Sequence, residues 1–148
     1  MKDIVFVIGI SSAGKSTFIK EKFPDYKVLD VFSYQKKRQP TFCNTLASYY
    51  ELAADLCLLL ERENRIVIEH TLSKKKRREM YIKIIEELTH EKPRAIYLKP
   101  SLETYKRNLK ARGIKNNDVD YDYLHYYLDQ FEEPTIDEGF SSVEVIEV

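Results

Sequence analysis

The chain of 148 residues has the length of one domain, and 43% of its residues are hydrophobic, which is enough to form a core. Lysine plus arginine equals aspartate plus glutamate at 24 each, so the net charge is zero, which argues against a protein that coats nucleic acid by charge alone. No cysteine or histidine pair has the spacing of a zinc site, and Cys43 and Cys57 are expected to be buried, reduced thiols.

Nothing in the chain is typical of a targeting or membrane segment. The N-terminal residues lack the charged start and the cleavage site of a signal peptide. The longest apolar segment, 41–60, is interrupted by Asn44, Glu51 and Asp55, so it is not expected to span a membrane. We therefore expect a soluble, cytoplasmic protein without a membrane partner; the pattern gives no prediction of its oligomeric state.

Strand and helix patterns alternate along the whole chain. Short segments rich in β-branched and aromatic residues predict strands at 4–8, 26–29, 65–69, 94–98 and 143–148. Helical spacing of apolar residues predicts helices at 15–23, 41–62, 73–90, 101–112 and 118–131. This alternation predicts an α/β fold, a three-layer α/β/α sandwich around a five-stranded parallel sheet. No domain boundary is visible, so residues 1–148 are expected to form a single domain.

The most specific motif is a phosphate-binding loop between the first strand and the first helix. Residues 9–16 match the pattern G-x-x-x-x-G-K-[ST], in which consecutive backbone N–H groups surround phosphate oxygens at a helix N-terminus. Lys15 is expected to reach the outer phosphates of ATP, and the Ser16 hydroxyl to bind Mg²⁺. The expected ATP-binding residues are Gly9, Ser11, Ser12, Ala13, Gly14, Lys15, Ser16 and Thr17.

Three later stretches, 68–81, 101–113 and 131–148, follow this loop in a characteristic order. They carry an acidic residue and a threonine after the third strand, a basic helix with an asparagine, and a closing F-x-x-P-x-x-x-E-G-F pattern. In this order they resemble the kinase domain of polynucleotide 5′-hydroxyl kinases, within the small AAA-type, zeta-toxin-like P-loop kinases. The resemblance implies a P-loop NTPase fold of the nucleotide-kinase type and an ATP- and Mg²⁺-dependent phosphotransferase; the closing pattern is expected to be mostly structural.

The acidic candidates follow two of the predicted strands. Asp30 ends the second strand, and strand ends line the crevice of an open α/β sheet. The resemblance makes Asp30 the general base; the alternative is a helix cap. Glu69 and Thr71, after the third strand, are expected to face the acceptor, although the resembling kinases usually have Asp where Glu69 stands. His70 between them is expected to be structural.

The cationic candidates lie on two predicted helices. The resemblance places lid cations on the helix that ends at Gly113, where Arg107 and Arg112 are the catalytic candidates and a solvated basic face is the alternative. The block 74–78, KKKRR, is either a contact surface for a phosphodiester backbone or an exposed helix start. Within it, Arg78 matches a family arginine that contacts the acceptor phosphate.

The leading hypothesis is a kinase that transfers the γ-phosphate of ATP to a hydroxyl, with a polynucleotide 5′-hydroxyl as the favoured acceptor. Residues 31–40 lack the Arg-Asp pair that nucleic-acid kinases usually have there, so a nucleoside, nucleotide, sugar or antibiotic stays open as acceptor. A third hypothesis, of another class, is an ATP-regulated binding module with little turnover.

Overall fold

The computed structural model describes residues 1–114 and 121–148. Its elements are, in chain order, β1 (Asp3–Ile8), α1 (Lys15–Lys22), β2 (Lys27–Asp30), α2 (Val31–Gln35), α3 (Phe42–Arg62), β3 (Arg65–His70), α4 (Lys75–Thr89), β4 (Arg94–Lys99), α5 (Leu102–Ala111), α6 (Tyr121–Asp129), a 3-10 turn η1 (Ile136–Glu138) and β5 (Val143–Glu147). Each predicted strand is present, and each predicted helix has a counterpart. The first residues of the helix predicted at 118–131 lie outside the described residues.

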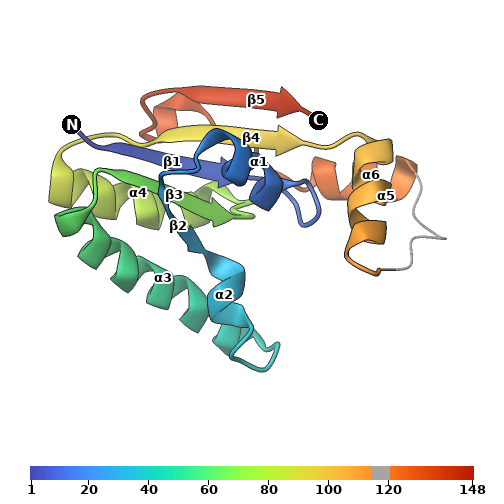
Figure 1. The fold of residues 1–148 in the computed structure, drawn as a ribbon, viewed down its shortest axis with the longest axis horizontal. Helices are drawn as coiled ribbons and strands as arrows, with labels where there is room; N and C mark the ends of the chain where they lie inside the picture. Colours follow the sequence, from blue (N-terminus) through green and yellow to red (C-terminus); the bar gives the residue numbers. More distant parts are fainter. Residues whose placement is uncertain (115–120) are drawn as a thin grey trace.

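The five strands form one parallel sheet in the order β2-β3-β1-β4-β5 (Figure 1). β1 lies at the centre between β3 and β4, and its residues 4–8 are all buried, as expected of a strand covered on both faces. The predicted α/β class and parallel sheet are thus confirmed.

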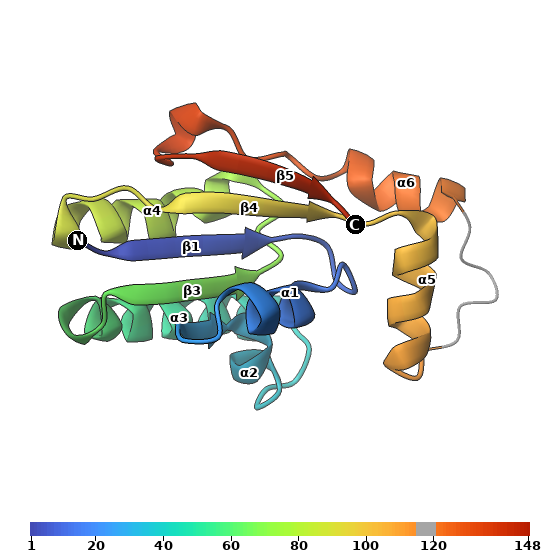
Figure 2. The same ribbon diagram turned by 45° about the horizontal axis from the view of Figure 1, so that its top comes forward.

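Helices cover both faces of this sheet. α3 and α4 run together along one face, and α1 lies on the other (Figures 1 and 2). On the α4 face, the Phe6 ring meets Tyr81 of α4 and Phe140 edge-on, with centroids 6.4 and 5.4 Å apart. Burial of one such apolar side chain stabilises the fold by about 1.5–3 kcal/mol.

All five strands end at the same edge of the sheet, where α2 and α5 also lie (Figure 2). Ser101 caps the start of α5, and its Oγ accepts a hydrogen bond of 3.2 Å from the Thr104 N–H. α2 was not predicted, because five residues are too few for a periodic pattern. Asp30 starts it by accepting a hydrogen bond of 3.0 Å from the Phe32 N–H.

Two further expectations concern the cysteine side chains and the possibility of a membrane-spanning helix. The expected burial of the thiols is wrong for Cys43, which is exposed on the first turn of α3, while Cys57 is half-buried; neither forms a disulfide. Within 1–114 and 121–148, no helix combines the length and the apolar character needed to cross a membrane.

Candidate active site

The loop between β1 and α1 has the backbone that its glycines allow. Gly14, at φ +93°, adopts a left-handed conformation directly before the first residue of α1, and Ser12 is also left-handed at φ +67°. A Cβ atom at Gly9 would lie 3.0 Å from the Leu98 carbonyl oxygen, so a side chain there would collide with β4. The glycines thus allow the left-handed and closely packed backbone that a phosphate-binding loop requires.

Lys15 is held within this loop. Its side chain is only 5% exposed, and Nζ donates hydrogen bonds of 2.8 and 2.9 Å to the carbonyl oxygens of Gly9 and Ile10. Burial lowers the pKa of the Lys15 ammonium to about 8, although the carboxylates of Glu69 and Asp30 act in the opposite direction. The Lys15 side chain thus provides a positive charge at the phosphate-binding loop.

Two carboxylates face this cation from neighbouring strands. Asp30 of β2 and Glu69 of β3 are partners in the parallel register, so their side chains leave the sheet on the same side. Glu69 is 5% exposed and accepts a hydrogen bond of 2.9 Å from the Ser16 hydroxyl. Burial is the main cause that raises the pKa of Glu69, and the nearby Asp30 charge adds to it.

Asp30 is both a helix cap and a residue of the cavity wall. It caps α2 through Oδ1, and it also lines the same cavity as Lys15. The helix-cap alternative is therefore compatible with a position in the site. Its assignment as general base stays a prediction.

α5 closes the opposite side of the loop. The Asn108 side-chain amide donates a hydrogen bond of 2.9 Å to the Ser12 carbonyl oxygen. The Arg112 guanidinium donates bonds of 2.9 and 2.6 Å to the hydroxyls of Ser11 and Ser12. Arg107 is exposed and is not among the residues that line the cavity. Of the two lid arginines predicted as catalytic, the structure brings only Arg112 to the site.

These groups line one cavity of about 440 Å³ at the carboxyl edge of the sheet. Its walls are Ser11, Ser12, Gly14, Lys15, Ser16, Thr17, Asp30, Phe32, Lys36, Glu69, Asn108, Ala111 and Arg112. Two predicted ATP-binding residues, Gly9 and Ala13, are buried within the loop and do not line the cavity. Thr71 is half-buried after β3 and also does not line it.

Sequence reasoning missed Phe32 and Lys36, which line the cavity from α2 and its C-terminal end. A signal for them exists in retrospect. They follow Asp30 and are four residues apart, so once Asp30 starts a helix they fall on one helical face. The pattern was not used because this helix was not expected.

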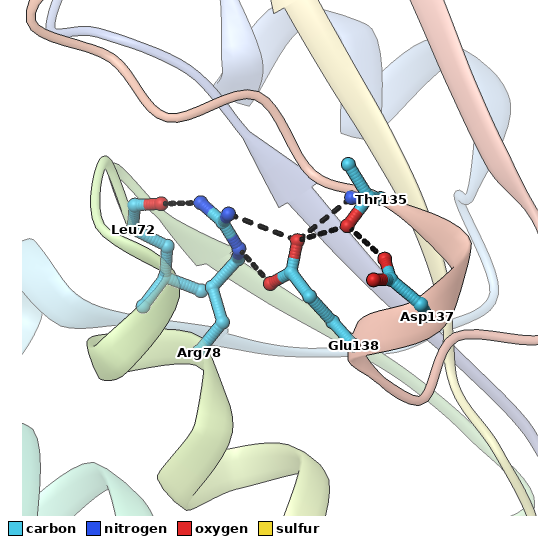
Figure 3. Close-up of polar contacts among 5 residues, drawn as sticks. All are labelled: Leu72, Arg78, Thr135, Asp137 and Glu138. Carbon is cyan, nitrogen blue, oxygen red and sulfur yellow. Dashed lines mark hydrogen bonds and ion pairs between the residues drawn. The ribbon is translucent and has the colours of Figure 1, made fainter.

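The prediction for Arg78 is wrong. Its side chain is fully buried, and its guanidinium forms a bidentate ion pair with Glu138 and bonds to the Leu72 carbonyl oxygen (Figure 3). Arg78 thus has its donors engaged inside the molecule and does not reach an acceptor. The physical reason is its place on the buried face of α4, beside Tyr81, Ile82 and Ile85.

The donors in the cavity suit magnesium. Hard oxygen ligands and substrate phosphates are what Mg²⁺ binds in proteins, and the Ser16 hydroxyl lies here beside the Glu69 and Asp30 carboxylates. Within the described part of the chain, no group of three or more histidine, cysteine, aspartate or glutamate side chains forms a metal site by itself. A protein-only metal cage is thus not found there, whereas Ser16 fits a metal shared with a bound nucleotide.

Fold and site together define a P-loop domain. A family model described as an AAA domain matches residues 4–134, so the chain belongs to that family. A search among curated proteins gives no significant match.

Solved structures share the fold at low sequence identity. A gluconokinase from Sinorhizobium meliloti 1021 is 18% identical, with a TM-score of 0.61, over 99% of this chain and 82% of that one. The Mycobacterium tuberculosis APS kinase in complex with AMPPNP and APS is 13% identical, with a TM-score of 0.64, over 97% and 88%. The Pnkp1/Rnl/Hen1 RNA repair complex contains a match that is 12% identical, with a TM-score of 0.68, over 87% of this chain and 43% of that one.

Proposed function

We propose that this protein is an ATP-dependent kinase that transfers the γ-phosphate to a hydroxyl acceptor. The observation that carries the proposal is a single cavity in which Lys15 of the phosphate-binding loop and the Asp30–Glu69 carboxylate pair face one another. A cation for the phosphates and a base for the hydroxyl are the two parts that phosphoryl transfer needs within one site.

In this mechanism the loop N–H groups and Lys15 hold the phosphates of ATP, and Ser16 would hold Mg²⁺, which would supply neutralisation of phosphate charge. The acceptor oxygen forms a bond to the γ-phosphorus, while the bond from the γ-phosphorus to the β–γ bridging oxygen breaks and ADP leaves. The acceptor proton passes to the Asp30 carboxylate. Arg112, which lies over the loop at Ser11 and Ser12, stabilises the charge that spreads over the transferring group.

We favour a polynucleotide 5′-hydroxyl as the acceptor. Support comes from the wall of the cavity, which includes the aromatic Phe32 and the cation Lys36 together with Asp30. Bases stack on aromatic side chains and phosphodiesters attract lysine, so this pair suits the end of a strand. The match to the RNA repair complex is compatible with such an acceptor.

A small molecule is the second candidate acceptor, and one observation favours it. Arg78, the cation that the resemblance assigned to an acceptor phosphate, is used inside the molecule. The acceptor wall therefore offers fewer fixed cations than the sequence suggested. The matches to a gluconokinase and an APS kinase are compatible with this alternative.

One transfer assay separates the candidates. The protein is incubated with γ-labelled ATP and Mg²⁺, together with 5′-hydroxyl DNA and RNA oligonucleotides or with a pool of nucleosides, nucleotides and sugars. Label on an oligonucleotide end supports the favoured acceptor, and label only in the pool supports the small-molecule kinase. ATP binding without transfer to any acceptor, or to water, would contradict the kinase proposal and leave the regulatory module.

Replacing Lys36 by glutamine tests the acceptor wall. For an anionic acceptor, we expect KM to rise about three- to fivefold with kcat unchanged, the factor that follows from a surface ion pair of up to about 1 kcal/mol. Lys37→Gln is the matched control, because Lys37 is exposed on the same segment but does not line the cavity. An equal effect of both substitutions would show that only general charge matters, and Lys36 would then lose its assigned role.

The pH dependence of ATP binding tests Lys15. Its pKa is lowered to about 8, so the ammonium is charged below that pH and neutral above it. Phosphates favour the charged form, so ATP affinity should be constant near pH 7 and fall by up to about tenfold per pH unit above pH 8. Calorimetry between pH 7 and 9.5 at constant salt measures this, and proton uptake on binding at pH 9 is expected. An affinity that does not change over this range would contradict the assignment.

A further inference from the structure

The loop between β3 and α4 is bound from the far end of the chain by a buried charged pair. Arg78 of α4 donates from Nε and Nη2 to the two carboxylate oxygens of Glu138, over 2.7 and 3.1 Å. Its third contact, from Nη1, is a bond of 2.7 Å to the Leu72 carbonyl oxygen (Figure 3). The side chains of Arg78 and Glu138 are 0% and 3% exposed. The guanidinium thus joins η1 to the backbone of this loop.

Leu72 needs such a contact because of its backbone. Its φ is +44°, a left-handed conformation that residues other than glycine rarely adopt, and its side chain is only 2% exposed. The Leu72 N–H donates to Nδ1 of His70 over 3.3 Å, while the carbonyl accepts from Arg78. The turn is therefore held at both of its polar backbone groups.

Glu138 is itself fixed by a second set of bonds. One of its carboxylate oxygens accepts from the Thr135 N–H over 2.7 Å, and the Thr135 side chain accepts from the Glu138 N–H, which makes a capping box at η1. Nearby, the Glu132 N–H donates to the Ser73 carbonyl oxygen over 2.8 Å. The segment 132–138 is thus linked to the loop directly at Glu132 and, through Arg78, at Glu138.

Stability alone does not account for this arrangement. A buried ion pair loses the hydration of both charges, and well-packed apolar residues often serve equally well in its place. An apolar pair, however, would offer no donor to the Leu72 carbonyl. The arginine therefore adds a contact that fixes the position of the loop between β3 and α4.

That position bears on the cavity through β3. Glu69 and His70 are the last two residues of the strand, so their side chains point to opposite faces. Glu69 faces the cavity and Ser16, whereas His70 packs between Tyr49 of α3 and Tyr81 of α4, with centroids 4.7 and 5.8 Å away. Because Nδ1 of His70 accepts from Leu72, its proton is on Nε2. The turn at Leu72 is therefore bonded to His70, the residue next to Glu69 at the end of the strand.

We propose that Arg78 and Glu138 are positioning residues of the active site, which hold the left-handed turn at Leu72 so that the end of β3 presents Glu69 to the reacting groups. This inference rests on the proposed kinase function for its effect on turnover. The effect of the Arg78–Glu138 pair on the position of the turn does not depend on kinase activity and can be measured without it.

The test removes the pair without leaving a buried charge. The variant is Arg78→Met with Glu138→Gln, in which glutamine keeps an oxygen for the Thr135 N–H. The matched control is Arg94→Met with Asp3→Asn, another bidentate pair, with both bonds at 2.9 Å, at the amino ends of β4 and β1. Should the first variant fail to fold by circular dichroism, Arg78→Met with Glu138→Leu takes its place.

Two readouts are measured on each folded variant. The first is kcat and KM for the acceptor, with the ATP dissociation constant. The second is the ¹⁵N spectrum of the His70 ring, which distinguishes a proton on Nε2 from a mixture of tautomers. For the Arg78 variant we expect kcat to fall about tenfold to a hundredfold with ATP affinity nearly unchanged. The His70 signals should move to a mixture, and the control should match the wild type in both readouts.

A folded variant with wild-type kcat and an unchanged His70 spectrum would overturn the proposal and leave the pair a packing role. If the wild-type protein phosphorylates no acceptor, the kinase proposal fails by itself. The His70 spectrum then decides the inference alone, because a changed spectrum supports the positioning of the turn and an unchanged one refutes it.

Discussion

Replacing Lys15 by methionine is expected to abolish phosphoryl transfer, with a loss in kcat of at least about 10²- to 10³-fold. Lys15 is the buried cation of the cavity, and its Nζ is already aimed at the loop through Gly9 and Ile10. Methionine keeps most of the length and the apolar stem but removes the charge. The fold should persist, because water in the cavity can take the place of Lys15 as hydrogen-bond donor to the two carbonyl groups. Initial rates with saturating ATP measure the effect.

Lys20→Met is the control for this substitution, because Lys20 lies on the same helix and is exposed. It should leave kcat unchanged. Circular dichroism and thermal unfolding establish that both variants are folded. Full activity of a folded Lys15→Met protein would refute the assignment of the loop as the donor site.

Replacing Asp30 by asparagine should lower kcat by about 10²-fold or more, while ATP affinity changes little. The amide cannot accept the proton of the acceptor hydroxyl at neutral pH. Its oxygen can still accept from the Phe32 N–H, so the start of α2 is retained. This substitution therefore separates the proposed base from the cap. Steady-state kinetics and a calorimetric ATP titration give the two numbers.

Asp25→Asn, at an exposed position before β2, should behave as the wild type and is the matched control. Normal turnover in Asp30→Asn would remove Asp30 from the mechanism. Among the residues that line the cavity, Glu69 is the other carboxylate, so Glu69→Gln would be the next variant.

The fold was predictable because its signals are local and repeated. The strands are short apolar runs, and the phosphate-binding loop is fixed by glycines at positions where a Cβ would collide or the backbone is left-handed. α2 escaped prediction because Asp30 and five following residues form it without a repeated apolar pattern. Because α2 is not predicted, Phe32 and Lys36, the two cavity residues that bear most on the acceptor, are not predicted either.

For Arg78, the helical pattern of α4 and the family resemblance predict different positions. Residue 78 falls on the same helical stripe as Tyr81, Ile82 and Ile85, which predicts burial. Family resemblance favoured a surface role instead. The partner acid, Glu138, is 60 residues away in the chain, and no local pattern connects the two. Only the fold could pair them, which is why the acceptor side of the site was the least predictable part.

The way in which α2 begins has a consequence for engineering. Asp30 caps the start of the helix through Oδ1, and its carboxylate also interacts with Glu69 in the cavity, so the cap and the site share one residue. The same short helix carries Phe32 and leads to Lys36, whereas the phosphate-binding loop belongs to β1 and α1. Substitutions at Phe32 and Lys36 should therefore redirect the enzyme to new acceptors while its use of ATP is preserved.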